Sequence, residues 1–126
     1  MSSEAAPVYA RSVIEIAERL VDAVARRDWD GIAACFTPEA RLRMLTPGPL
    51  REDEGPEAIA ARFRYWFGEL EDFEVRESDV TVIADRVRIH YRAVGSGKTT
   101  DHTGYLAVED GRVAWLVMTC TGFRTT

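Results

Sequence analysis

The stretch that decides the fold is Tyr105-Leu-Ala-Val-Glu-Asp-Gly-Arg-Val-Ala-Trp-Leu-Val-Met-Thr-Cys-Thr-Gly-Phe-Arg124. Two apolar runs flank Glu109-Asp110-Gly111, and Asp-Gly supplies the positive φ that a tight β-hairpin turn needs. The second run is apolar on both faces, with Leu116, Met118 and Cys120 on one face and Trp115, Val117 and Phe123 on the other. A strand with two apolar faces must be covered on both sides.

Upstream of this hairpin the chain alternates between helical and extended patterns. Apolar spacing and capping residues predict three helices, over residues 8–27, over 29–36 behind an Asp28 N-cap, and from Pro56 through the stripe Ile59, Phe63, Trp66, Phe67 and Leu70. Strands are expected over 40–46, 73–84, 86–94 and 100–109, and the turn-rich, acidic segment 46–55 is expected to be a surface loop. This order predicts an α+β domain in which helices pack against one antiparallel sheet.

Size and charge narrow the class of protein. The 126 residues fit one domain over residues 8–126 behind a disordered tail at residues 1–7. The net charge of −5 argues against nucleic acid and anionic membranes as partners, and no apolar run reaches the roughly 20 residues of a spanning helix. The first seven residues lack signal-peptide features, and Cys35 and Cys120 show no paired spacing. We therefore expect a cytoplasmic protein with two reduced, buried cysteines.

Several short motifs, in order, resemble the nuclear-transport-factor-2-like superfamily and, within it, the SnoaL-like, polyketide-cyclase-type branch. They are Arg27-Asp28-Trp29-Asp30, the run from Ile32 to Ala40, Gly55-Pro56-Glu57-Ala58-Ile59-Ala60, Glu109-Asp110-Gly111-Arg112-Val113 and Gly122-Phe123-Arg124. The resemblance covers roughly residues 13–124. It implies a cone-shaped α+β barrel, with a curved antiparallel sheet wrapped around three N-terminal helices and an apolar cavity at the wide end. Family members include isomerases, cyclases, dehydratases, epoxide hydrolases and binding-only proteins, because one fold hosts many functions.

The resemblance also allows a test of known chemistry. Ketosteroid-isomerase-like members use a tyrosine and two aspartates, one of them held protonated. Aligned on the shared motifs, those positions fall at about Leu20, Met44 and Gly104, none of which transfers a proton. The Asp-Arg-Asp group of epoxide hydrolases has no evident counterpart here. The classical proton-transfer residues are therefore absent.

Strand alternation predicts which side chains face the cavity. Tyr91 and His102 are the polar members of that set and the candidate catalytic residues, His102 as acid or base and Tyr91 as donor to a developing oxyanion. Both residues also have a structural interpretation, as a strand-end network for His102 and a buried ring for Tyr91. The predicted ligand-binding wall is Leu20, Met44, Trp66, Val87, Ile89, Leu106, Leu116, Met118 and Cys120.

The opposite face carries Arg88, His90 and Arg92, which we interpret as a solvated or dimer-facing polar stripe. Asp101 precedes His102 and should point away from it, so a His-Asp dyad is not implied. Tyr105, Trp115, Val117 and Phe123 would leave a contiguous apolar patch, which predicts a homodimer through the outer sheet face.

Two functions remain open from the sequence. The first is a cofactor-free cyclase-, isomerase- or dehydratase-type enzyme acting on a small hydrophobic carbonyl or polyketide-like compound. The second is a non-catalytic ligand-binding protein of the same fold. Neither a metal-ligand cluster nor a nucleotide-binding motif is found, so no cofactor is expected. A purely structural role through the sheet ranks behind both.

Overall fold

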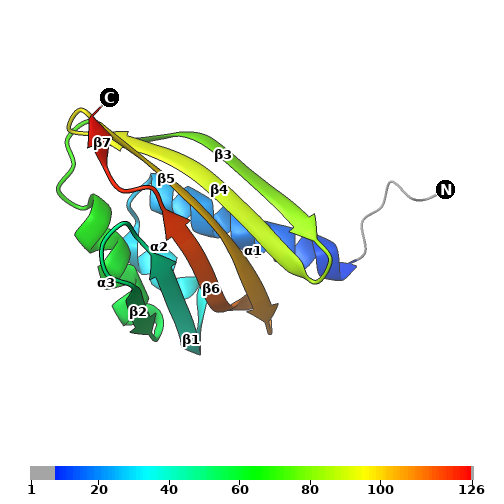
Figure 1. The fold of residues 1–126 in the computed structure, drawn as a ribbon. Helices are drawn as coiled ribbons and strands as arrows, with labels where there is room; N and C mark the ends of the chain where they lie inside the picture. Colours follow the sequence, from blue (N-terminus) through cyan, green and yellow to red (C-terminus); the bar gives the residue numbers. More distant parts are fainter. Residues whose placement is uncertain (1–7, 126) are drawn as a thin grey trace.

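The structure is a computed structural model that describes residues 8–125, and the predicted tail at residues 1–7 lies outside that range. The helices are α1 (Val8–Ala25), α2 (Trp29–Ala34) and α3 (Pro56–Phe67). The strands are β1 (Phe36–Leu45), β2 (Arg51–Glu54), β3 (Glu74–Ile83), β4 (Arg86–Gly95), β5 (Lys98–Glu109), β6 (Arg112–Cys120) and β7 (Arg124–Thr125). Figure 1 shows the long strands crossing in front of α1, with α3 beside the β1–β2 hairpin.

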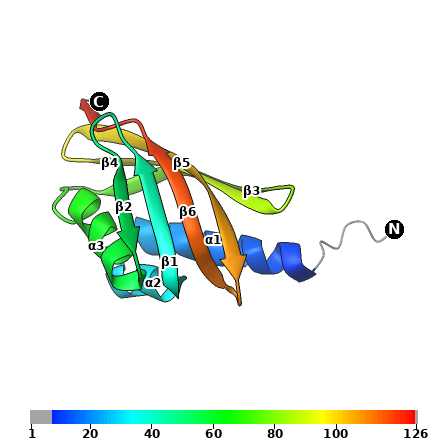
Figure 2. The ribbon, with the colours of Figure 1, turned by 60° about the horizontal axis from the view of Figure 1, so that its bottom comes forward.

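One curved sheet carries the fold. Its strand order is β2-β1-β6-β5-β4-β3, with β7 paired to β5, so β2 and β3 are the edges and the sheet is not closed into a barrel. All three helices lie against one face of this sheet, as the rotated view of Figure 2 shows. The predicted α+β architecture of helices against a curved sheet is confirmed.

Two local signals act as the sequence predicts. The Asp28 carboxylate accepts a hydrogen bond from the Gly31 amide at 3.0 Å, which caps α2. Pro56 occupies the first turn of α3 behind Gly55, whose φ of 91° only glycine adopts readily. These caps set the directions in which α2 and α3 leave the loops before them.

Three predictions about the first strands are wrong. The second helix ends at Ala34 and the strand begins at Phe36, where residues 29–36 were expected to be helical. The segment expected to be a loop contains β2, which pairs antiparallel with β1 and places Glu52 at 3.2 Å from Arg43. The sheet is also not wholly antiparallel, because β1 runs parallel to β6, with Leu42 opposite Leu116.

The register sets three rows of side chains on the inner, helix-facing side of the sheet. Row A is Tyr91, His102 and Cys120; row B is Ile89, Gly104, Met118 and Met44; row C is Val87, Leu106, Leu116, Leu42 and Asp53. Rows B and C are buried and apolar up to Asp53 at the edge of the sheet. Within these three rows, the buried polar side chains are therefore those of Tyr91 and His102 in row A.

In row B, the atoms around Gly104 occupy the space that a side chain at this position would need. A Cβ built at this position would lie 2.5 Å from Met118 Cγ and 2.5 Å from the Val117 carbonyl oxygen. Met118 thus fills the space that a side chain at position 104 would need. The packing around Gly104 therefore leaves no room for a side chain at this position.

Gly104→Ala should therefore destabilise the fold. We expect a loss of about 1–3 kcal/mol in the free energy of unfolding, because the new methyl group overlaps backbone as well as a side chain. Gly48→Ala is the matched control, since the nearest atom to its Cβ is Thr46 Oγ1 at 3.8 Å, and it should change stability by less than about 0.5 kcal/mol. Urea titration of both variants measures the difference, and equal stabilities would show that Met118 moves aside freely.

Candidate site at the Tyr91–His102 pair

The two candidate catalytic residues meet on the inner face of the sheet. Tyr91 on β4 and His102 on β5 are register partners, and Tyr91 Oη lies 2.7 Å from His102 Nδ1. The exposed fractions of the two residues are 1% and 0%. A hydrogen bond of this length between two buried side chains is strong, because no water competes for either partner.

The other ring nitrogen of His102 has no partner. Nε2 is buried and makes no hydrogen bond to any residue that the structure describes. Buried polar atoms are nearly always paired, so the unpaired ring nitrogen is an exception that needs a functional or structural explanation.

Aromatic rings from α3 enclose the imidazole. The Trp66 ring centroid lies 5.4 Å from that of His102 in an edge-on arrangement, and the Phe67 centroid is also 5.4 Å away. Phe67 in turn contacts the rings of Tyr91 and Phe73. Cys120, the register partner of His102 on β6, completes the surroundings. The polar pair therefore sits within an apolar, largely aromatic wall.

Burial changes the acid–base behaviour of both residues. It lowers the pKa of His102 from 6.5 to about 3, although the Asp101 carboxylate acts in the opposite direction. Burial, and to a lesser degree Cys120, raises the pKa of Tyr91 well above 10. At neutral pH the pair is an uncharged imidazole bonded to an uncharged phenol.

The predicted wall residues are on the inner side of the molecule. Leu20, Met44, Val87, Ile89, Leu106, Leu116 and Met118 are buried, and Trp66 and Cys120 are half-buried and pack against the same core. Of this set, Trp66 and Cys120 lie directly beside His102, whereas most of the others form rows B and C. Whether they contact a ligand stays a prediction.

Phe123 does not belong to the outer sheet face. Its ring packs edge-on against Phe67, with the centroids 6.2 Å apart, and Phe67 lies on the helix side of the sheet. The chain turns there through Gly122, whose φ is 80° and whose Cβ would meet Pro47. The expectation that Phe123 joins Tyr105, Trp115 and Val117 in one patch is wrong, because this turn carries its ring to the other face.

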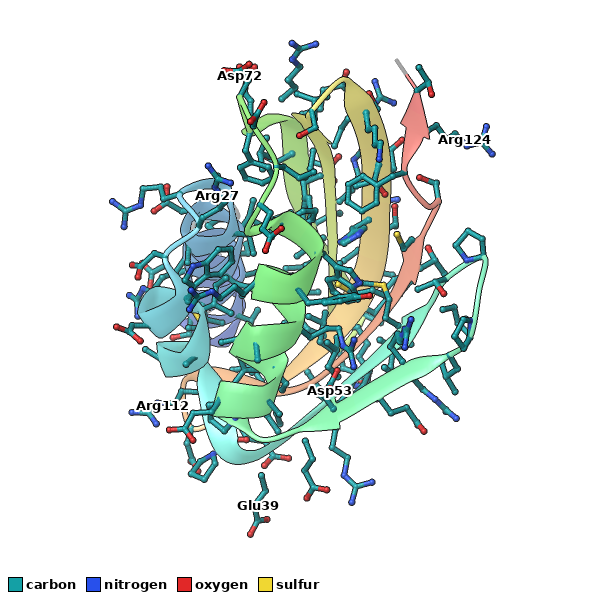
Figure 3. The ribbon with its side chains drawn as sticks, turned by 90° about the vertical axis from the view of Figure 1, so that its left-hand side faces the viewer. Arg27, Glu39, Asp53, Asp72, Arg112 and Arg124 are labelled. Carbon is teal, nitrogen blue, oxygen red and sulfur yellow. The ribbon has the colours of Figure 1, made fainter. Side chains whose placement is uncertain are left out.

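A second polar pair lies on the inner face and was not predicted from the sequence. Arg62 on α3 donates to both oxygens of Asp53 on β2, at 2.9 Å from Nε and 3.4 Å from Nη2. Figure 3 places Asp53 on the side of the hairpin that faces α3. Alternation along residues 51–54 would have indicated it, had that segment been assigned to a strand. The pair ties the hairpin to α3.

The outer face carries an ion-pair network instead of a second site. His90 Nε2 lies 3.2 Å from Asp101 Oδ1, and Arg92 Nε lies 3.1 Å from the same oxygen. Arg88 pairs with Asp79 at 3.4 Å. Asp101 therefore points away from His102, as predicted, and its histidine partner is His90. Within residues 8–125 no group of three His, Cys, Asp or Glu side chains is placed to hold a metal ion, and no helix in that range has the length and apolar character needed to cross a membrane.

The structure thus defines a small α+β domain, in which helices lie against one face of a curved sheet and a buried polar pair lies on that same face. The sequence of residues 17–116 matches the SnoaL-like domain, and the chain belongs to that family. No protein of curated function matches the sequence significantly.

Similar solved structures show the same fold at low sequence identity. A candidate ketosteroid isomerase from Kribbella flavida has a TM-score of 0.72 and 13% identity, over 92% of this chain and 82% of its own. A candidate polyketide cyclase from Xanthomonas campestris has a TM-score of 0.69 and 18% identity, over 86% and 90%. An LEH-like epoxide hydrolase from M. tuberculosis has a TM-score of 0.65 and 18% identity, over 87% and 83%.

The buried imidazole predicts a specific acid sensitivity. His102 takes up a proton more readily in the unfolded chain, with a pKa of about 6.5, than in the folded protein, with a pKa of about 3. Stability should therefore fall as the pH drops below about 6.5, by up to about 1.4 kcal/mol per pH unit from this residue. His102→Gln should remove this contribution to the slope, whereas His90→Gln on the outer face should retain it. Denaturant titrations between pH 4 and 7 measure it, and identical slopes in all three proteins would contradict a neutral buried His102.

Proposed function

We propose that this protein acts on a small apolar carbonyl or polyketide-like compound inside the cone, by cofactor-free chemistry of the cyclase, isomerase or dehydratase type. The observation that carries the proposal is the buried Tyr91–His102 pair with Nε2 unpaired. A site with apolar walls and one polar centre selects a hydrophobic molecule and fixes its orientation through that centre. The SnoaL-like family and the cyclase, isomerase and epoxide-hydrolase neighbours support the same class of chemistry.

A binding function without turnover is the second candidate, and the closure of the site favours it. Because Trp66 and Phe67 contact the His102 ring and neither polar residue is exposed, a ligand must displace an aromatic ring to enter. An enzyme needs this opening in every catalytic cycle, for substrate entry and for product release, whereas a protein that retains its ligand needs it rarely. Turnover measured on any compound that binds separates the two functions.

A ligand screen tests the site. We expect small hydrophobic carbonyl compounds to raise the melting temperature of the wild type and to shift NMR signals of residues around His102. His102→Ala and Tyr91→Phe should weaken binding about tenfold or more, because each removes a partner from the polar centre. His90→Ala, on the outer face, should bind as the wild type does. A library that leaves the wild type unchanged, or binding that is equal in all four proteins, would count against a site at this pair.

We further propose that the protein is a cytoplasmic homodimer that pairs through its outer sheet face. Tyr105 and Val117 are register partners on that face and are 43% and 38% exposed, with Trp115 beside them. A surface hollow of about 480 Å³ lies beside this patch over β1, β2 and β6, and it is lined by Trp115 and Val117 together with charged side chains of β1 and β2. A two-fold contact would cover the exposed Tyr105 and Val117 side chains on both copies. Both cysteines are free, and burial raises the pKa of Cys35 to about 11, which suits a reducing compartment.

Val117→Glu should convert the dimer to a monomer, because it places two like charges in the centre of the contact without their counter-ions. Tyr65→Glu is the matched control, since Tyr65 is 71% exposed on α3, away from the sheet. Sedimentation at micromolar concentration should show a dimer for the wild type and for the control. A wild type that sediments as a monomer would rule out the interface.

A further inference from the structure

In the hydrogen bond between Tyr91 and His102, either the phenol or the imidazole can be the donor. A phenol has one O–H, and a neutral imidazole has one N–H and one nitrogen lone pair. If Tyr91 donates, Nδ1 accepts and Nε2 carries the ring hydrogen. If Nδ1 carries the hydrogen and donates to Oη, the phenol hydrogen must find another acceptor.

The surroundings decide between these arrangements. Among residues 8–125, Tyr91 Oη makes no hydrogen bond besides the one to Nδ1, and Nε2 makes none. Donation by Tyr91 therefore leaves one buried group unpaired, the Nε2–H. The reverse arrangement leaves two, the phenol O–H and the Nε2 lone pair. Each buried unpaired group carries a desolvation penalty, so the first arrangement is favoured by roughly ten- to a hundredfold.

The groups that face the imidazole do not offer it a counter-charge. They are Tyr91 on β4, Cys120 on β6 and the rings of Trp66 and Phe67 on α3. The Cys120 sulfur is already within 3.3 Å of Thr100 Oγ1 and of the Gly122 amide. Asp101, the nearest carboxylate along the chain, is turned to the outer face and paired with Arg92. The ring is therefore neutral, in agreement with its lowered pKa.

We infer that His102 is a neutral hydrogen-bond donor through Nε2–H, that Tyr91 is the positioning residue that fixes this tautomer, and that the bound molecule presents an uncharged acceptor, such as a ketone or ester oxygen. This inference rests on the proposed function for the location of the ligand, and it reverses the roles that the sequence suggested. The Tyr91 proton is held by Nδ1 and is not free for an oxyanion, while His102 supplies the donor. A neutral donor of this kind polarises a carbonyl group without transferring its proton. A carboxylate would lose its hydration in exchange for one neutral donor, which disfavours anionic ligands.

The tautomer is tested without any ligand. The chain has two histidines, so His90→Gln leaves His102 as the sole source of imidazole signals. In ¹⁵N NMR spectra of this protein we expect a protonated Nε2, an unprotonated Nδ1 and no titration between pH 5 and 8. Adding Tyr91→Phe removes the donor to Nδ1 and should let the ring populate both tautomers. A protonated Nδ1 in the His90→Gln protein, or titration near neutrality, would overturn the inference.

The acceptor preference is tested with two ligands of the same shape. Cyclohexanone carries a carbonyl oxygen where methylenecyclohexane carries a CH₂ group. We expect cyclohexanone to bind about tenfold more tightly and to shift the Nε2 signal, and His102→Ala to abolish the difference. Equal affinities for the two compounds would overturn the acceptor assignment. If neither compound binds, the proposed ligand site fails, while the ring measurement still decides the proton arrangement by itself.

Discussion

The hydrogen bond from Tyr91 to His102 is the constraint around which the interior is organised. It places two polar groups at the centre of an apolar core, where each must be paired or leave a desolvation penalty. Because successive side chains of a strand point to opposite faces of the sheet, the two histidines lie in different environments. His102 and Tyr91 share the inner face and are uncharged, while His90 and Asp101, one residue away on each strand, belong to an outer ion-pair network.

The aromatic cover over this pair is held in place by Arg27, a cation in the turn between α1 and α2. Arg27 Nη1 donates to the carbonyl oxygens of Phe67 and Leu70, at 3.0 and 2.9 Å, and its guanidinium lies 4.9 Å from the centroid of the Phe73 ring. The last carbonyl groups of a helix have no partner within the helix, and a positive charge suits that end. By satisfying these groups, Arg27 fixes the end of α3 that carries Trp66 and Phe67. Phe123 packs on Phe67 from the opposite end of the chain.

The alternation of inward and outward side chains along the strands and the local helix caps could be predicted from the sequence. Contacts between distant segments could not. The inward direction of Tyr91 and His102 follows from strand periodicity, and the α2 cap follows from Asp28. The strand β2 was missed because Arg51–Glu54 contains no apolar residue and is held by partners on β1 and α3. The parallel pairing of β1 with β6 and the reversal at Gly122 depend on how remote segments meet. Whether Nε2 of His102 has a hydrogen-bond partner depends on which atoms surround the ring in the folded protein, and this cannot be predicted from the composition.

The packing of row B explains why the polar centre lies where it does. In row B, Met118 fills the space beside Gly104, so that even a methyl group at that position would collide. Two residues further back along β5, about 7 Å along the strand, the same inner face holds His102. The imidazole therefore lies one row away from Gly104, in row A. A neutral imidazole can donate a hydrogen bond to a carbonyl oxygen from an apolar surface without having to be kept protonated against neutral pH. A donor that stays neutral by burial needs no other proton-transfer residue beside it, and the buried side chains of rows B and C are apolar.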